Sequence, residues 1–118
     1  MNAALVEAHA PKPVILVGGR LLSVRNIARI AADVSAISFD ELRGPRRFPH
    51  LVQARALTMW AVKTLRPELS FAQIGAQLDG KDHTTVIHQY KMALQLLETD
   101  PDFVDRCHAV LSEVSWQI

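Results

Sequence analysis

The stretch SFAQIGAQLDGKDHTTVIHQY, residues 70–90, contains two helix starts separated by a turn. Ser70 and Gln73 have the spacing of a capping box, in which the serine side chain and the glutamine side chain each satisfy a free backbone N–H. The dipeptide Asp79-Gly80 is typical of a turn. The run KDHTT, residues 81–85, then places several hydrogen-bonding side chains at the start of a second, longer helix. Two helices joined by a turn that contains glycine predict a helix-turn-helix.

Helical patterns also cover the chain on both sides of this stretch. We expect a helix over 24–36 capped by Ser23, and a short helix opened by the capping box Ser38–Glu41 and stopped at Gly44-Pro45. Further helices are expected from about 50 to 65, across 86–97, and after the cap and proline of Asp100-Pro101. The inward-facing residues expected on 86–97 are Val86, Ile87, Tyr90, Ala93, Leu94 and Leu97. No alternating strand pattern is seen, so the predicted fold class is all-α.

The composition is that of one soluble domain. Of 118 residues, 49% are hydrophobic and 21% charged, and no apolar run approaches the roughly 18 residues of a membrane span. A single cysteine, Cys107, fits a reducing compartment and falls on an apolar stripe, so we expect a buried thiol in a cytoplasmic protein. Residues 1–20 contain HAPKP, VILV and VGG and predict a flexible N-terminal arm, followed by one domain over 21–118.

The charges are unevenly distributed although the net charge is only +1. Residues 42–67 contain no acidic residue and six basic ones, whereas Arg106 alone opposes five acidic residues after position 97. This pattern indicates a basic middle and an acidic C-terminal helix. Two ordinary solvated faces would give the same pattern, so charge alone leaves the function open.

The polar cluster at 81–85 is suited to reading DNA. In a helix-turn-helix, the first residues of the second helix meet base edges in the major groove. Threonine methyls can contact thymine methyls, aspartate can accept from cytosine, and the helix N-terminus offers N–H groups to phosphate. His88 lies one turn later on roughly the same side. The alternative is a capping cluster, in which Asp82 or Thr84 closes the helix and the other side chains are solvated.

At these residues the sequence resembles a known family. GKDHTTVIH resembles the signature of the C-terminal DNA-binding domain (domain IV) of the bacterial replication initiator DnaA, and LSFAQIGAQL resembles its first helix-turn-helix element. RNIARIAADVSAISFDELRGPRR resembles the opening helix, short helix and basic loop of that family. The resemblance covers about 23–97 and implies a helical bundle of the Trp-repressor-like, DnaA C-terminal type.

The resemblance also implies a DNA-binding surface. Arg47 would enter the minor groove beside a DnaA box with Arg46 close by, and the major groove would be read from the start of the second helix. Arg55 matches a helix arginine that contacts DNA, and Lys63 matches a lysine near the DNA backbone. Phe71 and Ala72 match positions where the first element approaches the duplex. The implied set, together with His88, is Arg46, Arg47, Arg55, Lys63, Phe71, Ala72, Lys81, Asp82, His83, Thr84, Thr85 and His88.

The sequence departs from the family pattern at several positions. Ala54-Arg55-Ala56 stands where Pro-Arg-Gln is common, Ala72 replaces a proline, and Asp79 replaces the first glycine of the signature. The connection 66–69 is one residue longer than in the family pattern. The chain contains no GxxxxGK[ST] phosphate loop, so we expect no nucleotide cofactor and no ATPase activity. His83 and His88 do not converge around a helix, so no metal site is expected, and no catalytic set stands out.

These observations predict a stand-alone, non-enzymatic, monomeric protein that binds DnaA boxes in double-stranded DNA, associates with the nucleoid and modulates replication initiation. The N-terminal arm is expected to recruit a partner such as another initiation factor. Two alternatives remain: an adaptor that works mainly through protein contacts, and a transcription regulator that uses the same boxes at promoters.

Overall fold

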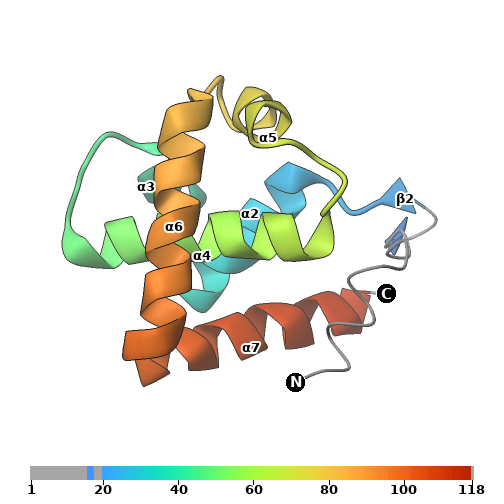
Figure 1. Cartoon of the computed structure of the whole chain (residues 1–118). Helices are drawn as coiled ribbons and strands as arrows, with labels where there is room; N and C mark the ends of the chain where they lie inside the picture. Colours follow the sequence, from blue (N-terminus) through green and yellow to red (C-terminus); the bar gives the residue numbers. More distant parts are fainter. Residues whose placement is uncertain (1–15, 18–19, 118) are drawn as a thin grey trace.

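The computed structural model describes residues 16–17 and 20–117, and within them it is almost entirely helical. A two-residue antiparallel ladder pairs β1 (Leu16–Val17) with β2 (Arg20–Leu21). The helices are α2 (Val24–Val34), α3 (Phe39–Arg43), α4 (Pro49–Leu65), α5 (Phe71–Gln77), α6 (His83–Thr99) and α7 (Pro101–Gln117) (Figure 1). The all-α class is confirmed, and the short ladder was not expected. The predicted arm lies outside the described residues, apart from the ladder positions 16, 17 and 20.

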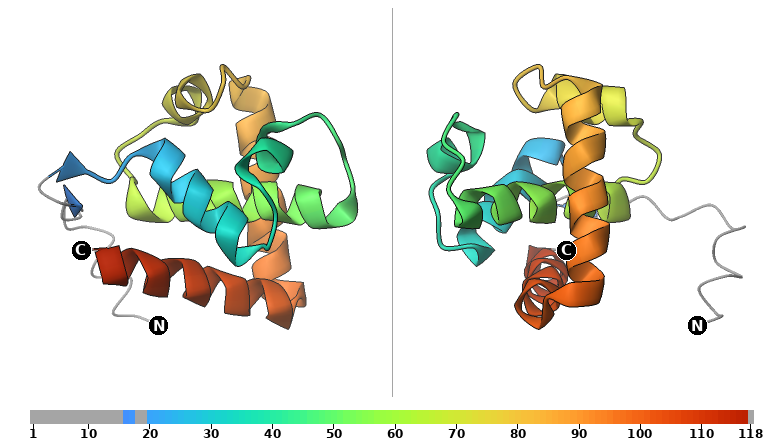
Figure 2. Two further views of the ribbon diagram at one scale, coloured as in Figure 1. Left: turned by 180° about the vertical axis from the view of Figure 1, so that it is seen from behind. Right: turned by 60° about the vertical axis from the view of Figure 1, so that its left-hand side comes forward.

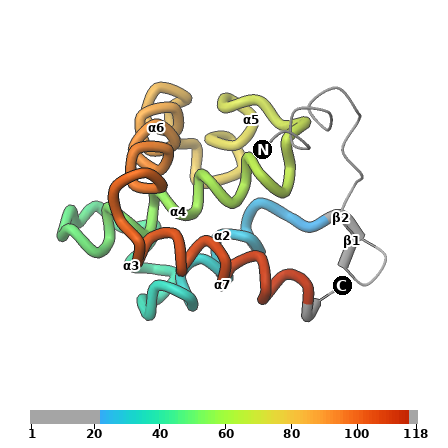
Figure 3. The backbone as a smooth tube through the Cα atoms, turned by 60° about the horizontal axis from the view of Figure 1, so that its bottom comes forward, coloured from blue at the N-terminus to red at the C-terminus, as the bar shows by residue number. Residues whose placement is uncertain are grey.

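Helix α4 forms the centre of the fold. It packs against α2, α6 and α7, which surround it on different sides (Figures 1 and 3). Buried positions occur all round this helix: Leu51, Ala54, Arg55, Ala56, Leu57, Thr58, Met59, Ala61, Val62 and Leu65. A helix with buried residues round most of its surface lies in the core. Each neighbouring helix then buries one stripe of side chains against it.

The helix starts follow the predicted caps. The Ser23 hydroxyl accepts from the Asn26 N–H at 3.0 Å, and both serine capping boxes form, at Ser38 and at Ser70. Asp100 Oδ1 accepts from the N–H groups of the first turn of α7, with Pro101 at the first helical position. These caps satisfy backbone donors that have no partner inside the helix, which fixes where each helix begins.

Helix α6 buries less surface than its apolar pattern predicts. It stands against α4 and α5, and α7 meets its C-terminal part (Figure 2). Val86 and Ala93 are buried, whereas Leu94 is 43% exposed. The prediction that Leu94 faces inward is therefore wrong, because the inner stripe of α6 is too narrow to include it. Ile87, Tyr90 and Leu97 are half-buried at the margins of this stripe.

Helix α7 closes the core opposite the helix-turn-helix. Its buried residues Phe103, Cys107, Val110 and Val114 recur at helical spacing and face α2 and α4. Cys107 is 2% exposed, and burial raises the pKa of its thiol to about 11. The thiol is therefore a protonated core group, as its position on the apolar stripe predicted. Within the described residues, no helix is long and apolar enough to cross a membrane.

The turn between α5 and α6 depends on a close backbone approach at Gly75. The Gly75 carbonyl accepts from the N–H groups of Lys81 at 2.8 Å and Leu78 at 3.1 Å. A Cβ on Gly75 would lie 2.1 Å from the Lys81 carbonyl oxygen, which is backbone and cannot swing away. Only glycine therefore allows α5 and the start of α6 to meet at this distance.

We predict that Gly75→Ala lowers the free energy of unfolding by about 1–3 kcal/mol, because the added methyl forces the turn open. Urea denaturation measures the change. Gly44→Ala is the matched control: its Cβ would lie 3.1 Å from the Asp40 carbonyl oxygen at an ordinary φ of −76°. A small shift relieves that contact, so the control should lose less. Equal losses in the two variants would contradict the close approach at Gly75.

Candidate nucleic-acid interface

The start of α6 presents its polar side chains to solvent. Asp82 occupies the N-cap position, yet its side chain makes no capping hydrogen bond. Its carboxylate is 66% exposed and lies 3.4 Å from Nδ1 of His83, whose side chain is 60% exposed. Thr84, Thr85 and His88 are exposed as well. The capping alternative for Asp82 is therefore wrong, and the side chains at this helix start are accessible to a ligand.

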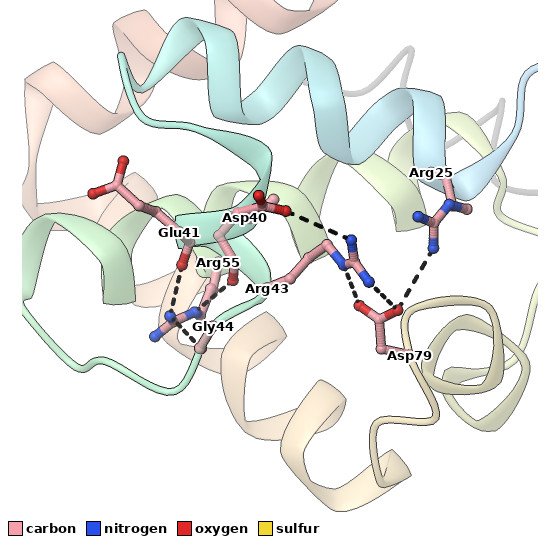
Figure 4. A network of polar contacts seen from close by, with 8 residues as sticks. Arg25, Asp40, Glu41, Arg43, Gly44, Arg55 and Asp79 are labelled. Carbon is pink, nitrogen blue, oxygen red and sulfur yellow. Dashed lines mark hydrogen bonds and ion pairs between the residues drawn. The ribbon is translucent and has the colours of Figure 1, made fainter.

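The basic loop between α3 and α4, residues 44–48, is held by Arg55. This side chain extends from α4 and is only 8% exposed. Four of its five N–H donors bind backbone carbonyls. Nε donates to Leu42 at 2.9 Å and Nη1 donates to Arg46 at 2.6 Å. Nη2 donates to Glu41 at 3.1 Å and to Gly44 at 2.8 Å (Figure 4). Burial lowers the pKa of this guanidinium, with nearby Arg47 as a smaller cause.

Arg55 therefore supports the loop: carbonyls use four of its donors, and one N–H of Nη1 is left for another partner. A contact of Arg55 with DNA stays a prediction. The side chains of Arg46 and Arg47, by contrast, are exposed on the loop that Arg55 holds. Sequence reasoning matched Arg55 by its position and type. It had no means of showing that four carbonyls converge on this side chain.

A groove separates the loop from α6 and has a volume of about 550 Å³. Water occupies about 30 Å³ in the liquid, so the groove has room for a much larger group. It brings together six of the twelve predicted residues, with no carboxylate in its lining: Arg47, Arg55, Lys81, Thr84, Thr85 and His88. Burial lowers the pKa of Lys81, and the charge of Arg55 lowers it further. Cations without an acidic neighbour in the lining favour an anion.

Three predicted residues lie apart from this groove, near the start of α5. Lys63 Nζ donates to the Leu69 carbonyl at 2.9 Å and lies 4.9 Å from the centre of the Phe71 ring. Phe71 is half-buried and packs against Tyr90, with 5.5 Å between ring centres. Ala72 is exposed beside it. Lys63 therefore holds the 66–69 connection in place, and its ammonium retains two further donors.

Two residues of this surface were not identified from the sequence. Phe48, the last residue of the basic loop and the N-cap of α4, is 53% exposed and stacks on His50, with 6.0 Å between ring centres. The interleaving of an aromatic residue with arginines in RRFPH is a signal that would have suggested it. Gln89 lines the groove, and its Oε1 is buried with no hydrogen-bond partner among the described residues. Its position on the groove side of α6 emerges only from the packing of that helix.

The site contains no candidate metal centre, since no group of three or more metal-ligating side chains converges in the described part of the chain. The chemistry that the surface offers is hydrogen bonding and positive charge.

We predict that Arg55→Lys lowers the free energy of unfolding by about 1–3 kcal/mol, because one ammonium cannot reach four carbonyls and leaves buried acceptors unpaired. Urea denaturation measures it. Arg46→Lys is the matched control, since it makes the same exchange on an exposed side chain of the same loop and should change stability by less than about 0.5 kcal/mol. If both variants unfold like the unmodified protein, Arg55 does not hold the loop.

Comparison with known proteins agrees with this architecture. The family model described as "Bacterial dnaA protein helix-turn-helix" matches residues 24–92. The chain is 32% identical over 106 residues to the chromosomal replication initiator protein DnaA of Laribacter hongkongensis, covering 90% of this chain and 22% of that protein. It is 36% identical over 98 residues to the DnaA of Acinetobacter baumannii, covering 83% and 21%, respectively.

The chain thus spans about a fifth of the length of the curated relatives it matches. The matched region is the helix-turn-helix part of those proteins, a DNA-binding element rather than a catalytic one. It includes α2 to α5 and the first part of α6, hence the whole groove and the basic loop. This chain belongs to the bacterial DnaA helix-turn-helix family.

Proposed function

We propose that the protein binds double-stranded DNA in a sequence-specific manner at DnaA-box-like sites and modulates chromosome replication initiation without ATPase activity. The observation that carries this proposal is the groove between the basic loop and the exposed start of α6. It is lined by cations and by Thr84 and Thr85 of the run that resembles the DnaA signature. Asp82 and His83 precede them at the start of α6. Family membership supports the link to replication.

The geometry supports a two-groove mode of binding. With the start of α6 in the major groove, the groove on the protein would receive the phosphate backbone of one strand, and the basic loop would reach the adjacent minor groove. Arg47 and Lys81 line the protein groove from its two sides and would neutralise the phosphates. In the free protein the charge of Arg55 acts on Lys81 and that of Arg47 acts on Arg55, so a bound phosphate would relieve repulsion among these cations.

Sequence discrimination is assigned to the start of α6. Because the Asp82 carboxylate makes no cap, it is available to accept from a cytosine amine. The threonine methyls of Thr84 and Thr85 are available to thymine, and the His83 imidazole is available for a hydrogen bond to a base edge. Phosphate contacts from the loop carry no sequence information, so these side chains decide the preference.

The simplest consequence for replication is competition. A monomer that occupies DnaA boxes, one domain to one box, would compete with a full-length initiator. It would share those sites with the initiator or withhold them from it. The polar side chains of the groove offer positive charge and hydrogen bonds that suit a polyanion. The proposed protein therefore acts by occupancy rather than by catalysis.

We predict that His83→Ala weakens binding to a DnaA box by about 1–3 kcal/mol and binding to scrambled DNA by less, because it removes a base contact rather than a phosphate contact. Fluorescence anisotropy with labelled duplexes at about 50 and 200 mM salt measures both. His108→Ala is the matched control, because it removes an exposed histidine from α7, which does not line the groove.

Preference for the box that survives the higher salt would establish a sequence reader. Equal binding to both duplexes that collapses with salt would contradict the proposal. In that case only the basic loop engages DNA, and an adaptor working through protein contacts becomes the better account.

A further inference from the structure

Asp79 occupies a strained position in the turn of the helix-turn-helix. Its φ is +60°, and that of the following Gly80 is +68°. This left-handed region suits glycine, and among other residues it is least unfavourable for asparagine and aspartate. At position 80 only this backbone conformation favours glycine, because an added Cβ would have no atom within 4 Å. An aspartate at 79 therefore calls for an interaction that its side chain supplies.

That interaction is a two-pronged ion pair with Arg43, the last residue of α3. Arg43 Nε donates to Asp79 Oδ2 at 2.6 Å, and its Nη2 donates to Oδ1 at 2.9 Å (Figure 4). Arg25 Nη1 on α2 lies 3.6 Å from the same Oδ1. The hydrogen bonds from Arg43 lower the pKa of Asp79, so the carboxylate stays ionised. Parallel hydrogen bonds of this type fix orientation as well as distance.

The arginine side of the pair is itself positioned by an aromatic ring. The Cζ atoms of Arg43, Arg25 and Arg29 lie 5.0, 5.3 and 4.4 Å from the centre of the Phe39 ring. Cations over a ring face are attracted to it, so Phe39 gathers three guanidinium groups at the junction of α2 and α3. Asp79 adds a carboxylate to this group of cations, and the turn is thereby tied to the two helices.

The location of the pair connects the two DNA-facing parts. Arg43 immediately precedes Gly44 and the basic loop, while Asp79 lies three residues before Asp82 at the start of α6. The pair joins residues that are 36 positions apart in the sequence. Both flanking segments line the same groove, the loop through Arg47 and the helix through Thr84. A change at the pair would shift one wall of the groove relative to the other.

We propose that Asp79 is a positioning residue: its ion pair with Arg43 sets the start of α6 relative to the basic loop and so determines site preference more than general DNA affinity. The inference rests on the proposed recognition of DnaA-box-like sites. A carboxylate on a phosphate-binding face would by itself weaken binding to any DNA. Its pairing with two arginines reduces that repulsion and leaves the geometric role.

The test compares variants at Asp79 with a matched loss of charge. Asp79→Gly removes the pair and relieves the left-handed strain, and Asp79→Asn keeps the shape and a conformation that asparagine tolerates. Asp40→Asn is the control: Asp40 lies 3.9 Å from Arg43 with a 95% exposed side chain, so it removes the same charge beside the same arginine without breaking the two-pronged bond.

We expect both Asp79 variants to reduce the ratio of box affinity to scrambled-duplex affinity by roughly three- to tenfold, with scrambled binding unchanged or stronger. Asp40→Asn should keep the ratio of the unmodified protein. Arg43→Lys, which keeps the charge and loses the fork, should reduce the ratio in the same way, and adding Asp79→Asn to it should cause little further loss. If the turn needs only its backbone conformation, Asp79→Gly will equal or exceed the unmodified protein, which would overturn the inference.

Amide hydrogen exchange provides a second readout that needs no DNA. The Lys81 N–H is bound to the Gly75 and Leu78 carbonyls, and the Val86 N–H is bound to the Asp82 carbonyl. Both should exchange faster in the two Asp79 variants than in Asp40→Asn and the unmodified protein. If the unmodified protein shows no box preference, the proposed function fails, yet exchange still decides whether the pair positions the turn. If exchange of these two amides is the same in all variants, the positioning role is refuted whatever the DNA results.

Discussion

The buried guanidinium of Arg55 makes the contacts on which the basic loop and its position beside the helix-turn-helix depend. Helix α4 is enclosed on every side, so a charged residue within it must find partners inside the protein. Arg55 finds them in the carbonyls at the end of α3 and in the loop that follows. The same contacts that satisfy the charge also fix the conformation of the loop. The loop contains no helix or strand whose own hydrogen bonds could do this.

This arrangement changes how the basic residues of the middle segment are divided. Arg43 is paired with Asp79, Arg55 with loop carbonyls, and Lys63 with the Leu69 carbonyl. The exposed Arg46 and Arg47 therefore form the accessible part of the basic loop. A count of basic residues overstates the number of cations free for a ligand, because four of the six act within the fold. Arg66 is the fourth, and it donates to the Glu68 carboxylate and to the Leu22 carbonyl. In the proposed complex with DNA, site preference would then depend more on the side chains at the start of α6 and on how that helix is held.

Local sequence patterns were sufficient for most of the fold because caps and turns act over a few residues. The serines at 23, 38 and 70 and the Asp100-Pro101 pair start helices where predicted, since each satisfies backbone donors within its own first turn. The failure at Leu94 has a tertiary cause. An apolar stripe identifies the side of a helix that prefers burial, but the width of the contact depends on the neighbours that cover it.

The sequence by itself determined the all-α class, the helix-turn-helix and the polar run 81–85, because these depend on residue spacing and short-range hydrogen bonds. The family relationship was also visible in that run. Only the tertiary structure decided that Arg55 supports the loop, that the Asp82 side chain leaves its helix uncapped, and that Asp79 and Arg43 meet. These outcomes depend on which groups converge from distant positions, and that convergence follows from packing around α4 rather than from any local pattern.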